Sequence, residues 1–77
     1  MARAKKNLGD IQKRLGNRVR KIRQERGWTQ LRLAEAAGMS KTYVCDLENG
    51  RKEPCLGSIQ ILAHTFEMSL AEFFGPL

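Results

Sequence analysis

A chain of 77 residues is long enough for one small domain and too short for two hydrophobic cores. Apolar residues make up 42% of the chain, which argues against disorder, and no apolar run approaches the roughly 18–20 residues of a membrane span. The net charge of +6 favours a polyanionic partner over a membrane interior.

The positive charge is concentrated towards the amino terminus. Residues 1–26 hold ten Lys or Arg against two acidic residues, a balance of +8, whereas residues 53–77 hold no Lys or Arg and balance to −3. One end of the molecule is therefore expected to attract polyanions and the other is not. Charge alone does not distinguish DNA, RNA and anionic lipid as the partner, so the choice among them rests on the spacing of residues.

Few residues are suited to metal or covalent chemistry. Cys45, Cys55 and the single His64 fall short of the four ligands of a structural zinc site, so we expect reduced thiols and an exposed or interface histidine. No paired carboxylates at a workable spacing and no glycine-rich phosphate loop are present. We expect a protein that is not an enzyme and has no metal, cofactor, small-molecule ligand or membrane partner. Without the apolar stretch of a secretory signal, it is expected in the cytoplasm.

The first elements are a basic arm and a long amphipathic helix. Residues 1–7 are predicted to form a flexible arm, which either follows DNA into a neighbouring groove or stays in solvent. Beyond it, apolar residues recur every three or four positions up to Gly27, which indicates a helix. We allow for a regular helix that begins only near Leu15, because Gly16 weakens a helix interior by about 1 kcal/mol relative to alanine. The apolar stripe consists of Leu8, Ile11, Leu15, Val19 and Ile22.

Two short capped helices are predicted next. Thr29 is a good N-cap for a helix that runs to about Ala37, and Ser40 caps a helix that ends at Asn49-Gly50. Between them, Gly38 supplies the left-handed backbone conformation that a sharp turn requires.

The carboxyl-terminal part is predicted to hold two more helices. Pro54 suits the start of the fourth, and the capping box from Ser69 to Glu72 opens the fifth. The fourth helix is expected to bury Leu56, Ile59, Leu62, Ala63 and Phe66. Since no segment shows the alternation of a strand, we predict an all-α fold of five short helices around one core, a single domain of residues 8–77 preceded by the arm.

Residues 29–50 carry the functional information, because they form a capped helix, a glycine turn and a second capped helix. In and around this segment the sequence resembles the Cro and phage-repressor type of helix-turn-helix, a large bacterial family of small repressors and controllers. The resemblance is carried in order by Leu15–Arg23, Trp28–Gln30, Leu33-Ala34, Gly38–Ser40, Leu47–Gly50, Lys52–Pro54, Leu62-Ala63, Met68–Leu70 and Phe73-Phe74. Leu31, where a charged residue is usual, and Cys55, where a serine usually caps, depart from it.

The resemblance implies a lambda-repressor-like domain that binds double-stranded DNA in a sequence-specific way and regulates transcription. A phage-type repressor and a restriction–modification controller both fit. By resemblance, Gln30 reaches a DNA phosphate or an end base, and Arg23 and Glu48 form a structural ion pair between the first and third helices. The positions that face base edges match Lys41, Thr42 and Asp46, with Tyr43 beside them, and the phosphate contacts of the following loop match Arg51 and Lys52.

The chemistry of these side chains agrees with the resemblance. Lys41 can donate to guanine O6 and N7, Thr42 can touch a thymine methyl group, and Asp46 can accept from cytosine N4. They lie on the exposed side of the third helix if Val44 and Leu47 take the buried side. Asp46 is almost as readily a local charge partner, and Tyr43 either contacts the DNA backbone or packs against the second helix. Backbone contacts that release counterions are expected from Arg18, Arg20, Arg51 and Lys52.

A single recognition helix reads too few base pairs for discrimination in a genome, so we expect a homodimer on a pseudo-palindromic operator. The candidate dimer surface comprises Ile61, Phe74 and Leu77, with Leu70 and Phe73 expected to support it from below, and the alternative is that these are ordinary core or tail residues. The alternative function is a protein-interaction module, such as an antitoxin or a transcription adaptor, with a toxin or RNA polymerase as partner.

Overall fold

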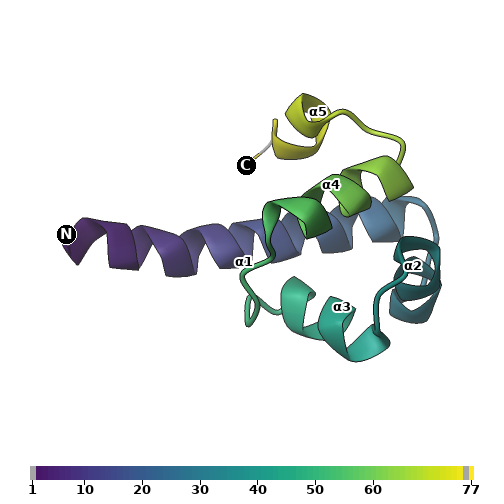
Figure 1. Ribbon diagram of the computed structural model, residues 1–77, viewed down its shortest axis with the longest axis horizontal. Helices are drawn as coiled ribbons and strands as arrows, with labels where there is room; N and C mark the ends of the chain where they lie inside the picture. Colours follow the sequence, from purple (N-terminus) through teal and green to yellow (C-terminus); the bar gives the residue numbers. More distant parts are fainter. Residues whose placement is uncertain (1, 76) are drawn as a thin grey trace.

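The computed structural model describes the backbone of residues 2–75 and 77, and side chains within the range 10–75 and at 77. Over these residues it has five helices and no strand, which confirms the predicted all-α fold: α1 (Ala2–Glu25), α2 (Gln30–Ala37), α3 (Lys41–Glu48), α4 (Leu56–Thr65) and α5 (Leu70–Phe74). Figure 1 shows the four short helices gathered around the carboxyl-terminal half of α1, while its first turns project beyond them. No helix in the described part of the chain is long and apolar enough to cross a membrane.

The first helix is longer than predicted. α1 begins at Ala2 and runs unbroken through Gly16, so the start near Leu15 is wrong and the backbone of residues 2–7 continues the helix instead of forming a separate arm. Alanine, arginine and lysine, which fill positions 2–6, are among the better helix formers. Asp10 and Arg14, one turn apart, add an ion pair with 3.5 Å between carboxylate and guanidinium.

The core lies between the carboxyl-terminal half of α1 and the short helices. Three aromatic rings pack through it: the ring centroids of Trp28 and Phe66 lie 5.8 Å apart, and those of Phe66 and Phe73 lie 6.5 Å apart. Offset stacking of this kind adds to the free energy gained from burial alone. The buried apolar residues are Leu15, Val19, Ile22, Leu33, Ala34, Val44, Leu47, Leu62, Ala63, Phe66 and Phe73.

Two residues expected in the core lie at the surface. Ile11 is 51% exposed, because the turn of α1 that carries it lies at the edge of the packed helices. Leu56 is 81% exposed, and it is the first residue of α4, which begins there and not at Pro54. The side chain of Leu8, the first member of the predicted stripe, lies outside the described residues.

Three of the predicted signals for helix starts are confirmed. Thr29 Oγ1 accepts from the backbone N–H of Arg32 at 3.0 Å, and Ser40 Oγ accepts from that of Tyr43 at 3.0 Å. Ser69 and Glu72 make both hydrogen bonds of the capping box. At Cys55 the N-cap position of α4 has no side-chain cap, which agrees with the departure noted there.

Candidate nucleic-acid interface

α2, the turn at Gly38 and α3 form a helix-turn-helix. Gly38 has φ +69°, as predicted, and its N–H bonds back to the last turn of α2. Met39 N–H donates to the carbonyl of Ala34 at 2.8 Å, which fixes the chain as it leaves the turn. α3 then packs against both α1 and α2, and it lies along one edge of the molecule in Figure 1.

The outward face of α3 carries the residues predicted to read base edges. Val44 and Leu47 are buried, while Lys41 and Thr42 are exposed together at the start of the helix. Asp46 lies one turn further along, half-buried, and accepts from Arg51 Nη1 at 3.4 Å. Its carboxylate is therefore already a local charge partner of the following loop.

The remaining candidate residues near α3 differ in how far their side chains are exposed. Tyr43 is half-buried and packs against the core, which corresponds to the packing alternative. Arg51 and Lys52 are exposed in the loop after α3. This loop leaves the helix through Gly50, which has φ +75°, a backbone conformation that residues other than glycine rarely adopt.

Beneath α3, Glu48 joins three helices. Its side chain is completely buried, and Arg23 of α1 donates to both carboxylate oxygens, from Nε to Oε2 at 2.7 Å and from Nη2 to Oε1 at 3.1 Å. Gln30 of α2 donates from Nε2 to Oε1 at 3.1 Å. Burial alone would raise the pKa of Glu48, but the hydrogen bonds from Arg23 and Gln30 outweigh burial and hold that pKa below its ordinary value.

The contact between Gln30 and Glu48 was missed from the sequence. Gln30 was assigned to the DNA backbone by resemblance, and its half-buried amide instead meets a carboxylate 18 residues away. Nothing in the local pattern signals this contact, because it depends on how α2 crosses the end of α3. A Gln30 amide held in this way keeps a second N–H available for another acceptor.

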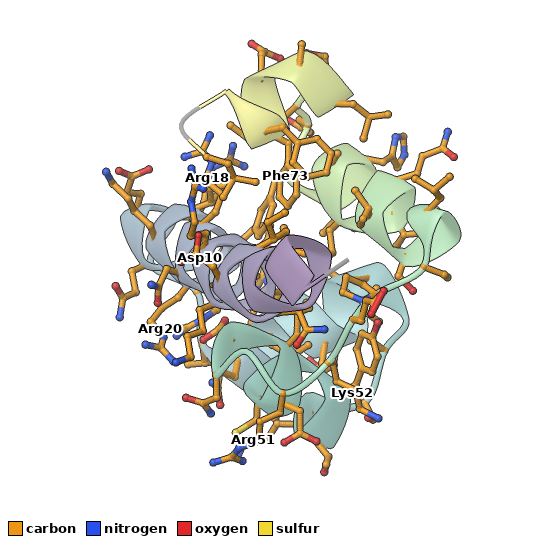
Figure 2. The ribbon with its side chains drawn as sticks, turned by 90° about the vertical axis from the view of Figure 1, so that its left-hand side faces the viewer. Asp10, Arg18, Arg20, Arg51, Lys52 and Phe73 are labelled. Atoms are coloured by element: carbon orange, nitrogen blue, oxygen red, sulfur yellow. The ribbon has the colours of Figure 1, made fainter. Side chains whose placement is uncertain are left out.

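Arg18 and Arg20, both predicted to contact the DNA backbone, point to opposite sides of α1, as Figure 2 shows. Arg18 donates to the carbonyls of Phe73 at 2.8 Å and Glu72 at 3.0 Å, so it binds the end of α5 on the side away from α3. These hydrogen bonds engage the Arg18 guanidinium on the α5 side, so the geometry does not favour its contact with DNA, which stays a prediction. Two residues along a helix turn the side chain by roughly 200°, which is why only Arg20 reaches α3.

Arg20 of α1 contacts the carboxyl-terminal end of α3. Its Nη2 donates to Asn49 Oδ1 at 3.1 Å and to the backbone carbonyl of Glu48 at 3.3 Å, and its Nε lies 3.4 Å from Glu48 Oε1. The two contacts of Arg20 with Glu48 are longer than those of Arg23, and the Arg20 side chain remains partly exposed.

Only some of the residues predicted for the dimer interface are exposed. Phe73 is completely buried in the core, where a residue that supports the surface from below is expected, whereas Leu70, expected beside it, is exposed. Ile61, Leu70 and Phe74 are exposed, and Leu77 is half-buried. Phe74 and Leu77 also line a largely apolar pocket of about 260 Å³ with Ile11 and Arg14.

Within the described residues, no three His, Cys, Asp or Glu side chains gather into a set that could hold a metal ion. Cys45 lies half-buried on α3, and Cys55 is exposed. The exposed side chains at the start of α3 and in the loop after it are polar and mostly basic.

Comparison with known proteins adds to this geometry. A family model described as Helix-turn-helix (HTH_3) matches residues 19–73, the segment from the middle of α1 into α5. The chain is 40% identical over 68 residues to the HTH-type transcriptional regulator DdrOP3 of Deinococcus deserti, covering 80% of this chain and 53% of that protein. It is 34% identical over 61 residues to the immunity repressor protein of Bacillus phage phi105, covering 79% of this chain and 42% of that protein.

Among solved structures, the restriction-modification controller protein C.AhdI from Aeromonas hydrophila superposes with a TM-score of 0.81. It is 29% identical in sequence, and the match covers 86% of this chain and 96% of that chain. The first curated relatives are longer, since this chain spans about half of their length or less.

Proposed function

The chain belongs to the helix-turn-helix family whose model matches residues 19–73, and from this premise we propose that it regulates transcription by binding specific sequences of double-stranded DNA. α3 enters the major groove, and Lys41 and Thr42 meet base edges. The protein acts in the cytoplasm as a repressor or controller, by occupying a site near a promoter.

The observation that carries this proposal is the combination of an exposed polar face on α3 with a rigid support behind it. Lys41 and Thr42 project outward, while the buried face of the same helix is held to α1 by Arg23 and to α2 by Gln30, both through Glu48. Side chains on a rigid element are held in one orientation, which the discrimination of base edges requires. Arg51 and Lys52 follow directly and supply phosphate contacts that fix the orientation on the duplex.

We propose in addition that two copies bind a pseudo-palindrome. Ile61, Leu70 and Phe74 are apolar and exposed on α4 and α5, the end of the chain that lacks Lys and Arg. Exposed apolar side chains gain free energy when they are buried, so these residues are suited to contact with a second copy. In this arrangement the two recognition helices lie about 34 Å apart, one turn of DNA.

The test compares two single substitutions on one selected site. Wild-type protein first selects its site from a random duplex pool, and the affinities of Lys41→Ala and Lys52→Ala are then measured for that site and for variants changed at single base pairs. Lys41→Ala is expected to lose discrimination worth about 1–3 kcal/mol at one base pair of each half-site. Lys52→Ala is expected to weaken all duplexes equally, because a phosphate contact carries no sequence information.

Two results would contradict the proposal. One is a wild-type protein that enriches no sequence from the pool. The other is a Lys41→Ala variant that discriminates among the single-base variants as well as the wild type does.

A further inference from the structure

A polar notch opens where α1 crosses the carboxyl-terminal end of α3. Its volume is about 210 Å³, and it is lined by Lys13, Asn17, Arg20, Glu48 and Asn49. Lys13, Asn17 and Arg20 follow one another at four and three residues, so they share one face of α1. We propose that this notch binds a phosphate of the DNA backbone outside the stretch that α3 reads; the inference rests on the function proposed above.

The charge in the notch favours an anion although a carboxylate lines it. Glu48 is completely buried, and both of its oxygens already accept hydrogen bonds from Arg23, with Gln30 on Oε1 as well. Arg23 neutralises its charge, so Arg20 and Lys13 remain as surplus positive charge at the mouth of the notch. A phosphate placed there meets two cations and no free carboxylate.

Arg20 is held loosely enough to serve a second acceptor. Its Nε–Oε1 distance to Glu48 is 3.4 Å, and its side chain is 37% exposed, whereas Arg23 is 12% exposed and approaches Glu48 to 2.7 Å. An arginine has five N–H donors, and the contacts at 3.1–3.4 Å leave some of them directed to solvent. Lys13 is exposed and forms no ion pair with any of the described acidic side chains.

The notch adjoins the end of the recognition helix. Gly50, in the turn that follows α3, lies against Lys13 so closely that a methyl group on Gly50 would stand 2.9 Å from Lys13 Cγ. The next residue is the exposed Arg51, and Figure 2 shows Arg20 and Arg51 projecting from neighbouring parts of the α1–α3 edge. Lys13, Arg20 and Arg51 therefore form one basic edge around Asn49 and Gly50. A duplex whose groove holds α3 brings a backbone strand along this edge.

The experiment uses Lys13→Gln, because Lys13 makes no ion pair whose loss would disturb the fold. The matched control is Lys21→Gln, the same change of charge at an exposed lysine of α1 beside Arg14 and Arg18, on the α5 side. The affinity of the whole protein for its selected duplex is measured as a function of salt concentration. Phosphate ethylation interference is recorded on the same duplex.

Lys13→Gln is expected to reduce the magnitude of the slope of log affinity against log salt by about 1 for each bound protomer, or about 2 for a dimer on two half-sites. It is also expected to remove from each half-site the interference at one phosphate, one that lies outside the bases read by α3. Lys21→Gln is expected to leave the interference pattern unchanged. If the wild type binds with a steep slope and the two variants behave alike, the notch proposal is overturned and the proposed function stands. If the wild-type slope is flat, the proposed function fails and the notch proposal fails with it.

Discussion

At the scale of single residues, the position of α3 depends on one buried carboxylate. Glu48 belongs to α3, Arg23 to α1 and Gln30 to α2, so their hydrogen bonds tie together the three helices of the interface. A buried ion pair adds little free energy relative to a well-packed apolar substitute, but removing one partner leaves the other charge uncompensated. Glu48 is thus expected to contribute the orientation of the recognition helix along with stability.

Replacement of Glu48 by glutamine tests this cluster. At pH 7 the variant is expected to lose about 3–5 kcal/mol of unfolding free energy, because Arg23 loses its charge partner. The folded-state pKa of Glu48 lies below the unfolded value of 4.5, so the carboxylate stabilises the fold above that pH and its contribution is lost as pH falls through the folded pKa.

Urea unfolding at pH 7 and pH 3 measures both effects. The wild type is expected to lose more stability than Glu48→Gln on going to pH 3, since only the wild type has this carboxylate to protonate. Equal losses in the two proteins would show that Glu48 has no lowered pKa in the folded state.

At the scale of elements, the crossing of α1 and α3 determines how far α3 stands from the body. The contact is made backbone to backbone at Gly16, where a methyl group would lie against the carbonyl oxygen of Leu47 and 2.7 Å from that of Glu48. These oxygens belong to the end of α3, so they cannot move aside without moving the helix. Glycine at this position therefore allows the crossing, although it weakens α1 as an isolated helix.

Gly16→Ala is expected to lower the free energy of unfolding by about 1–3 kcal/mol, the usual cost of overpacking, even though alanine is the better helix former. Gly57→Ala in α4 is the control, because its methyl group would meet only Cys55 Sγ at an ordinary 3.8 Å. Chemical denaturation of the three proteins gives the comparison. A Gly16→Ala variant as stable as Gly57→Ala would contradict the close crossing.

Local signals and long-range contacts explain which elements were predictable from the sequence. Thr29, Ser40 and Gly38 act within one turn of a helix, so their residue types are enough to predict the ends of α2 and α3. The role of Gly16 depends on residues more than 30 positions away, and it was interpreted as a helix weakness. The partner of Arg18 was missed for the same reason: its charge suggests a phosphate, and only the packed fold reveals α5 as its partner.

At the scale of the whole molecule, the balance of charge changes along the chain. The amino-terminal 26 residues carry a balance of +8 and the last 25 a balance of −3, and the exposed Ile61, Leu70 and Phe74 belong to the acidic end. The sequence predicted this division because it follows from composition along the chain. It grouped Leu70 with Phe73 beneath the surface, whereas only Phe73 is core, since both residues are apolar and only burial distinguishes them.

The most direct test of the central claim, that α3 reads base edges in the major groove, replaces those edges one at a time. In the selected duplex, each guanine is exchanged for 7-deazaguanine and each thymine for uracil, which removes N7 or the methyl group from the major groove alone. The expected result is weakened binding at a few positions in two half-sites whose centres lie about 34 Å apart. Unchanged binding at every position would contradict the account.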